Sequence, residues 1–320
     1  MSKTSKAMPN SGAKPRIVFF GNERIASGVT TTCPVLQKLI DEGYEVLAIV
    51  VNQGTNTSRR ARMLEIADLA ERYEIPVFSP AKPADISEKL SALGADVGVL
   101  VAYGRLVPQE VIDIFPAGIV NLHPSLLPLH RGSAPIESAI LDGERVTGVS
   151  LMKVAKEMDA GDVYAYSEFE LTGGETKQQL ADELLELGGE MLAATLLRIV
   201  NGDIVGKAQD DSMATYDSHI SKVDSLIDLT KPAKQLEREI RAYAGWPGSR
   251  TTIAGKDVVI TAAHLDNNRL ENVDNKSTFV ANKQLCLQTS DGVLIIDRLK
   301  PAGKTEMPAD AFLAGYGQRL

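Results

Sequence analysis

The stretch Ile119-Val-Asn-Leu-His-Pro-Ser-Leu-Leu-Pro-Leu-His-Arg-Gly132 begins with a short, mainly apolar run that ends in a polar cluster. Such a run is typical of a strand buried inside a parallel sheet. Pro124 disfavours helical backbone at the residue before it, so the strand is predicted to stay extended through His123. Asn121 and His123 are two residues apart and therefore point to the same face of this strand.

Similar apolar runs precede this strand, and helical patterns lie between them. The runs span residues 16–20, 46–51 and 97–101, and the helical patterns span 32–42, 59–73, 86–93 and 109–115. This alternation predicts an α/β, Rossmann-like domain with a parallel-rich sheet and helices on both faces. Ligands of open α/β sheets bind at the carboxyl ends of the strands, which is where Asn121 and His123 are expected.

The second half of the chain has a different pattern. A helical pattern over 177–200, with a capping box formed by Thr176 and Gln179, precedes a polar, unpatterned stretch. A helix is expected at 233–243, and five short strand-like runs with little helix predict a small β-barrel of the oligonucleotide-binding (OB) type. The runs lie at 250–253, 257–263, 277–280, 284–289 and 293–299. We therefore expect a catalytic domain at 15–202, a linker at 203–220 and an OB-like domain at 221–320.

Composition excludes several classes of protein. The 320 residues suit two domains, and no apolar run approaches the ~20 residues of a membrane span. The two cysteines, Cys33 and Cys286, are far apart and form neither a disulfide framework nor a cysteine-built zinc site. A monomer in the reducing cytoplasm is expected.

Charge is distributed unevenly along the chain. The net charge of −8 counts against a nucleic-acid coat protein. Residues 1–230 hold 21 Lys and Arg against 32 Asp and Glu, whereas residues 231–320 hold 13 against 10. The resulting charges of −11 and +3 suggest two separate roles, with the second part meeting an anionic partner. Sampling noise in a 90-residue window is the alternative explanation of this asymmetry.

Asn121 and His123 together suit a reaction at a carbonyl group. An amide N–H and an imidazolium can both donate to an oxyanion, and imidazole can move a proton at neutral pH. Asp159 lies on an acidic loop, Glu157-Met-Asp-Ala-Gly-Asp162, which follows a strand-like run at 148–154. If the loop returns to the strand end, its carboxylate would orient the imidazole and favour its protonated form. Spacing alone favours the simpler interpretation of Asp159 as a turn residue.

The same residues allow other functions. His130 suggests a metal ligand, but no third ligand has a usable spacing, so no metal is expected. Ser125, His123 and Asp159 form a possible hydrolase triad, but Ser125 lacks the Gly-x-Ser-x-Gly turn. Gly21 is not followed by the spaced glycines of a dinucleotide site. A nucleic-acid binder using only the barrel would not need the acidic first domain.

Several motifs, in order along the chain, resemble the folate-dependent formyltransferase family. Asn121-Leu-His123, Ser125-Leu-Leu-Pro128, Arg131-Gly132 and Asp159-Ala-Gly161 match its signature elements, and the similarity runs from about 15 to 315. The resemblance implies a catalytic trio of Asn121, His123 and Asp159, and 10-formyltetrahydrofolate as the formyl donor. It implies folate-binding positions at Val101, Ala102, Tyr103, Gly104, Ser125, Leu126, Leu127 and Pro128.

The acceptor implied by the resemblance depends on the second domain. Ile240-Arg-Ala-Tyr-Ala-Gly-Trp-Pro-Gly248 and Leu299-Lys-Pro-Ala-Gly-Lys304 resemble the branch that formylates the α-amine of methionyl initiator tRNA for translation initiation. Sugar-nucleotide N-formyltransferases, which use the same donor, are the alternative. The resemblance also implies a tRNA-contacting loop at 53–62, shorter here than in that branch but containing Arg59, Arg60 and Arg62.

Replacing Arg59, Arg60 and Arg62 with Ala is expected to weaken tRNA binding and to leave the KM for the folate donor nearly unchanged. Binding to phosphate depends on charge, so the loss of affinity should be largest at low salt. The slope of log K against log[salt] should flatten by up to ~0.9 for each phosphate that the variant no longer neutralises. A wild-type tRNA Kd with a wild-type salt slope would show that these arginines do not contact tRNA.

Overall fold

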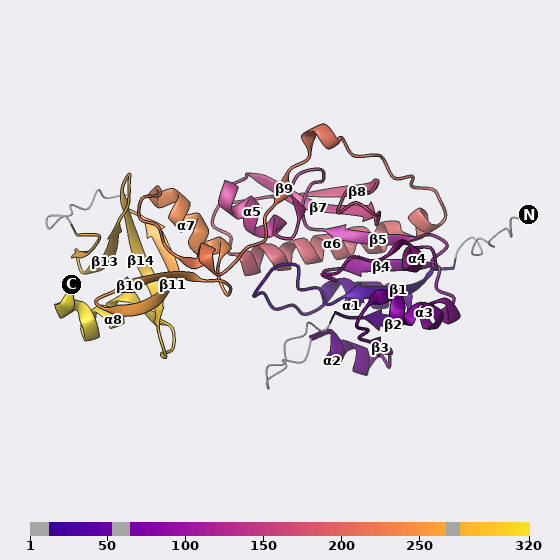
Figure 1. The fold of residues 1–320 in the computed structure, drawn as a ribbon, viewed down its shortest axis with the longest axis horizontal. Helices are drawn as coiled ribbons and strands as arrows, with labels where there is room; N and C mark the ends of the chain where they lie inside the picture. The colour runs from indigo at the N-terminus through magenta and orange to yellow at the C-terminus, as the bar shows by residue number, and fades with distance from the viewer. Residues whose placement is uncertain (1–12, 53–64, 267–275) are drawn as a thin grey trace, which may run out of the picture.

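The protein is described by a computed structural model for residues 13–52, 65–266 and 276–320. It forms two domains that lie end to end, with the N-terminal domain on the right and the C-terminal domain on the left of Figure 1. A long segment, orange in that view, leaves the N-terminal domain, arches over it and enters the C-terminal domain.

The N-terminal domain is built on a seven-stranded sheet with the order β3-β2-β1-β4-β5-β7-β8. The strands are β1 (Arg16–Gly21), β2 (Glu45–Val50), β3 (Val77–Phe78), β4 (Val97–Val101), β5 (Ile119–His123), β7 (Val146–Lys153) and β8 (Val163–Glu170). The first five pair in parallel, and β7 and β8 are added antiparallel. The predicted parallel-rich α/β sheet is confirmed, and its four apolar runs are β1, β2, β4 and β5.

Helices cover the two faces of this sheet. They are α1 (Pro34–Asp41), α2 (Glu65–Arg72), α3 (Ser87–Leu93), α4 (Gln109–Ile112), α5 (Pro135–Asp142) and α6 (Lys177–Val200). The predicted capping box of Thr176 and Gln179 begins α6. At Gly188 a Cβ atom would come within 2.4 Å of the Leu122 side chain, so glycine lets α6 lie directly against β5. This packing fixes the strand that carries Asn121 and His123.

The C-terminal domain is a curled antiparallel sheet with α7 (Ala233–Ala242) and α8 (Ala309–Tyr316) packed on it. The sheet order is β10-β11-β14-β13-β12, and β15 pairs with β14. The strands are β10 (Ser249–Ile253), β11 (Lys256–Leu265), β12 (Thr278–Ala281), β13 (Gln284–Gln288), β14 (Val293–Pro301) and β15 (Met307–Pro308). The five predicted strands are all present. The sequence patterns did not predict α8.

A buried ion pair lies where the domains meet. Lys177, at the start of α6, lies 3.4 Å from the Glu137 carboxylate and donates to the Trp246 carbonyl oxygen at 2.7 Å. Both charged side chains are at most 2% exposed. Burial raises the pKa of Glu137 and lowers the pKa of Lys177. The pair joins two helices of the N-terminal domain to the backbone of the C-terminal domain.

The stretch 203–220, expected to be a linker, connects the domains but also pairs with the N-terminal domain. Lys207 forms a β-bridge with Val163, and β9 (Tyr216–Asp217) pairs in parallel with β6 (Arg131–Gly132). Its polar sequence gave no sign of these pairings, because the partners are backbone groups that are distant in the sequence.

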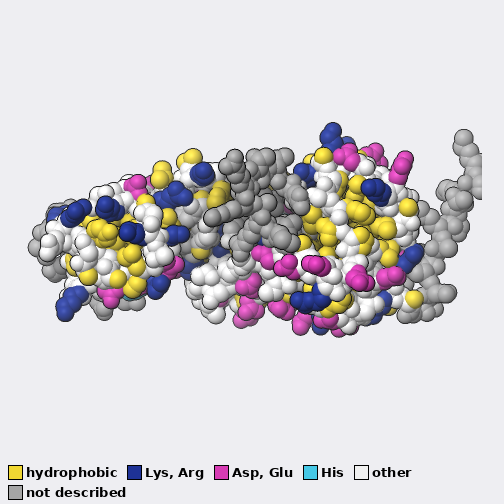
Figure 2. All heavy atoms as spheres, turned by 90° about the horizontal axis from the view of Figure 1, so that it is seen from below, with side chains coloured by type: hydrophobic (Ala, Val, Ile, Leu, Met, Phe, Trp, Pro, Cys, Tyr) yellow, Lys and Arg dark blue, Asp and Glu magenta, His cyan; other side chains and the backbone are white. Residues whose placement is uncertain are grey.

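The charge asymmetry expected from the sequence is visible on the surface. In the face seen in Figure 2, Lys and Arg predominate on the C-terminal domain at the left, whereas Asp and Glu line the lower edge of the N-terminal domain. Within the described ranges, no helix combines the length and apolarity needed to cross a membrane.

Lys177→Met should lower the free energy of unfolding by ~3–5 kcal/mol, because Glu137 would remain buried without its cation. The measurement is urea unfolding at pH 7. The double variant Glu137→Gln, Lys177→Met is the matched control and should recover a large part of the loss. Equal losses in the single and double variants would show that the ion pair is not the cause.

Candidate active site

Asn121 and His123 lie at the carboxyl end of β5, as predicted. The two residues are 8% and 4% exposed, and both line one cleft. β5 is flanked by the parallel strand β4 and the antiparallel strand β7, so the backbone under both residues is fixed by sheet pairing. Within the described residues the Asn121 amide has no hydrogen-bond partner, which leaves its N–H groups available to a ligand.

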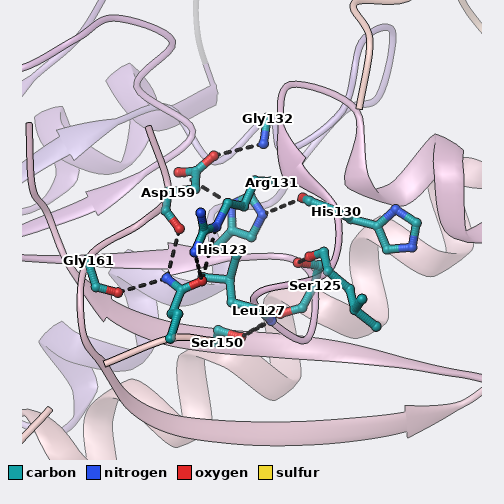
Figure 3. Close-up of polar contacts among 11 residues, drawn as sticks. His123, Ser125, Leu127, His130, Arg131, Gly132, Ser150, Asp159 and Gly161 are labelled. Carbon is teal, nitrogen blue, oxygen red and sulfur yellow. Dashed lines mark hydrogen bonds and ion pairs between the residues drawn. The ribbon is translucent and has the colours of Figure 1, made fainter. Parts of the chain in front are cut away.

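The ring of His123 has one nitrogen committed to the protein and one facing the cleft. Nε2 lies 2.9 Å from the His130 carbonyl oxygen (Figure 3). A carbonyl oxygen only accepts hydrogen bonds, so Nε2 carries the proton. Nδ1 faces the Asp159 carboxylate, with 3.8 Å between Nδ1 and Oδ1. In the neutral ring Nδ1 is therefore the nitrogen that can take up a proton.

Asp159 reaches His123 from the loop between β7 and β8. Its backbone is left-handed, with φ of 51°, and its Oδ2 accepts a hydrogen bond from the Gly132 backbone N–H at 2.9 Å. The three predicted catalytic residues thus meet in one cleft, and Figure 3 shows Asp159 beside His123. At 3.8 Å the carboxylate is placed to stabilise a protonated imidazole.

Ser125 is committed to the backbone. Its fully buried hydroxyl donates to the Leu129 carbonyl oxygen at 2.6 Å, which closes the turn after β5. The hydroxyl proton is thus directed away from His123, whose Nε2 already bonds to His130. This geometry excludes the alternative of a hydrolase triad with Ser125 as nucleophile.

The cleft has a volume of about 1030 Å³, and Asn121, His123 and Asp159 form part of its wall. Ala102, Tyr103 and Gly104 also line it. The other predicted folate-binding residues do not line the cleft. Val101 is buried in the hydrophobic core, and Ser125–Pro128 form the turn behind His123. A direct contact between these five residues and folate stays a prediction.

Tyr103 has a partly structural role. The side chain is 2% exposed, and its ring packs edge-to-face on Phe20 with 5.7 Å between centroids. Burial raises the pKa of the phenol.

The predicted tRNA-binding residues Arg59, Arg60 and Arg62 lie outside the described residues.

His130 forms a buried charge cluster that the sequence did not reveal. Nδ1 lies 3.0 Å from Asp217, and Nε2 lies 2.9 Å from Glu144. Hydrogen bonds to these two carboxylates raise the pKa of His130 to about 10, so the ring is a cation at neutral pH. A protonated imidazole cannot bind a metal, and the described ranges contain no cluster suited to one. The partners come from 14 and 87 residues away, which no local pattern indicates.

Comparison with known proteins agrees with this geometry. The model of the Formyl transferase family matches residues 16–196, and that of the Formyl transferase C-terminal domain matches 219–317. The chain belongs to the formyl transferase family. This formyl transferase is 35% identical to the methionyl-tRNA formyltransferase of Roseiflexus castenholzii, over 95% of this chain and 98% of the relative.

Solved structures share the fold of this formyl transferase. HypX from Aquifex aeolicus in complex with tetrahydrofolic acid superposes with a TM-score of 0.66 at 21% identity, over 95% of this chain and 48% of HypX. The N-formyltransferase from Helicobacter canadensis, bound to folinic acid and dTDP-3-aminofucose, has the same TM-score at 19% identity, over 88% and 98%. At these identities the likeness shows the fold alone.

His130 should contribute stability that depends on pH. Its folded-state pKa is raised from 6.5 to about 10, so the contribution is complete below pH 6.5 and disappears as the pH rises through 10. The difference in unfolding free energy between wild type and His130→Gln should therefore shrink with rising pH, by at most ~1.4 kcal/mol per pH unit. Urea unfolding at pH 6, 8 and 9.5 measures it. A difference that is constant over this range contradicts the charged cluster.

Proposed function

We propose that this formyl transferase moves the formyl group of 10-formyltetrahydrofolate to the α-amine of methionyl initiator tRNA. The observation that carries the proposal is the meeting of Asn121, His123 and Asp159 on the wall of one cleft. The near-full-length relatives named methionyl-tRNA formyltransferase support the choice of acceptor.

The cleft suits a folate donor in size and chemistry. Its volume of about 1030 Å³ is at the upper end of the range for small-molecule sites. Apolar residues such as Ile25, Leu106 and Met152 line it, while Asn121 and His123 provide polar groups at the strand end. An apolar pocket with a few convergent polar groups is what a flat pterin carrying a formyl group requires. The donor supplies an activated formyl carbon.

We assign distinct tasks to the chain's own residues. The Asn121 amide donates to the formyl oxygen as negative charge develops when the amine attacks the carbon. Nδ1 of His123 takes up the proton that the attacking amine loses, and it returns a proton to the nitrogen that leaves. The Asp159 carboxylate stabilises the imidazolium in between. A new C–N bond forms, the old one breaks, and the proton count balances.

The C-terminal domain is proposed to hold the tRNA. Its part of the sequence carries a net positive charge, and its exposed Lys and Arg side chains suit phosphate contacts (Figure 2). We propose the division into a catalytic domain at 15–202 and a tRNA-binding domain at 221–320 on the same grounds. Arg59, Arg60 and Arg62 are proposed as a second tRNA contact.

The acceptor is tested by offering the purified protein 10-formyltetrahydrofolate with charged initiator tRNA, uncharged tRNA or an amino-sugar nucleotide. Formyl transfer to charged initiator tRNA alone is the expected result. Transfer to the amino-sugar nucleotide alone would overturn the proposed acceptor and favour the sugar-nucleotide N-formyltransferase. No transfer to either would overturn the proposed reaction.

His123→Ala should lower kcat by ~10²–10⁴-fold, because a positioned group that transfers protons is removed. Its KM for the folate donor should change much less. Single-turnover formyl transfer measures the chemical step, and circular dichroism controls for folding. Met213→Ala is the control, since Met213 is 60% exposed and does not line the cleft. A folded His123→Ala enzyme with near wild-type kcat would show that His123 is structural.

A further inference from the structure

The segment that joins the two domains lies against the active site. Residues 207–217, here called the connecting segment, are held at both ends by backbone hydrogen bonds. Lys207 and Val163 exchange two bonds of 2.9 Å, and the Arg131 N–H donates to the Thr215 carbonyl oxygen at 2.9 Å. The connecting segment thus spans from β8 to the loop that follows β5.

The Gln209 side chain occupies the middle of this span. Its amide nitrogen donates to the carbonyl oxygens of Asp159 and Gly161, both at 2.8 Å. Its Oε1 accepts from Nη2 and Nε of Arg131 at 2.8 and 3.1 Å. Both polar groups of the amide are therefore hydrogen-bonded, the NH2 group as a donor of two bonds and the oxygen as an acceptor. Figure 3 shows Asp159, Gly161 and Arg131 converging on these contacts.

Arg131 is a fixed anchor for this amide. The residue is 1% exposed, and its guanidinium also donates to Asp211 at 2.7 Å and to the Tyr216 hydroxyl at 3.0 Å. It directly follows His130, whose carbonyl oxygen holds Nε2 of His123. Gln209 consequently links the loop that orients His123 to the loop that carries Asp159.

The Asp159 loop needs such a link. The backbone of Asp159 is left-handed, which is unfavourable for a residue other than glycine and persists only where surrounding contacts maintain it. Gln209 bonds to the carbonyl oxygens of Asp159 and of the residue two positions on, so it holds both ends of this turn. The distance of 3.8 Å between Asp159 and His123 depends on this turn.

We propose that Gln209 is a positioning residue that sets the Asp159 carboxylate against Nδ1 of His123. This role rests on the proposed formyl transfer. It adds Gln209, from the stretch between the two domains, to the residues that support that reaction. The backbone pairings at both ends of the connecting segment do not involve the Gln209 side chain. These pairings can therefore form without this amide, whereas the geometry of the catalytic loop depends on it.

Gln209→Glu tests the proposal, because it changes only half of the contacts. A carboxylate still accepts from Arg131, but it has no N–H for the two carbonyl oxygens and repels them. We expect kcat to fall by ~10–100-fold, in line with the cost of small misplacements at active sites. The KM for 10-formyltetrahydrofolate should change by less than ~3-fold, and the Tm by a few degrees. Met213→Ala is the matched control on the connecting segment, since Met213 is 60% exposed, and its kcat should be normal.

A double-mutant cycle separates positioning from a general structural effect. If Gln209 acts through Asp159, Gln209→Glu should have little further effect on kcat in an Asp159→Asn background. Two losses that multiply would overturn the proposal, as would a Gln209→Glu enzyme with a kcat within ~2-fold of wild type. Should Gln209→Glu fail to fold, the apolar Gln209→Met, of similar length, replaces it in the same cycle. The cycle is measured with whichever acceptor the wild-type enzyme formylates. A wild-type enzyme that formylates neither acceptor contradicts the proposed function. A Gln209 variant with wild-type kcat contradicts only the positioning role of Gln209.

Discussion

The hydrogen bond from Nε2 of His123 to the His130 carbonyl oxygen is the interaction on which the site depends. A carbonyl group cannot donate, so this one contact decides which ring nitrogen carries the proton and which faces Asp159. It also makes the chemistry of His123 depend on a backbone atom seven residues later in the chain. Anything that moves the loop after β5 moves the reactive nitrogen.

The loops around the cleft are held in unfavourable backbone conformations. Ala102, His130 and Asp159 all have φ between 51° and 57°, a region that disfavours residues other than glycine. Each belongs to a loop at one end of the sheet, and the last two are anchored by buried charges or hydrogen bonds. His130 is held by Asp217 and Glu144, and the Asp159 loop is held by Gln209. Such strain is typical of sites where the surrounding structure fixes the geometry.

The two domains are connected in ways that bear on the site. Lys177 and Glu137 join the helices beside the sheet to the backbone at Trp246, and the connecting segment passes the active site before the chain enters the C-terminal domain. The acidic first domain holds the proposed chemistry, and the more basic second domain is the proposed surface for an anionic acceptor. The connecting segment therefore ties the second domain to the loops of the cleft, whereas the ion pair ties it to helices α5 and α6.

The sequence by itself determined the central strands of both sheets, most of the helices and the place of the site, but not α5 or α8. Short apolar runs and Pro124 are local signals, and a strand end places Asn121 and His123 on one face because side chains alternate with a period of two. The resemblance of Asp159-Ala-Gly161 to a family motif predicted a catalytic role for Asp159, whereas spacing alone predicted only a turn residue. Only the tertiary structure decided the proton position on His123, the role of Ser125 as a turn residue and the charge on His130. It alone brought Gln209 to the site, from a stretch whose polarity suggested a simple linker. These features depend on contacts between residues up to 87 positions apart and on single carbonyl groups, and neither leaves a periodic or compositional trace in the chain.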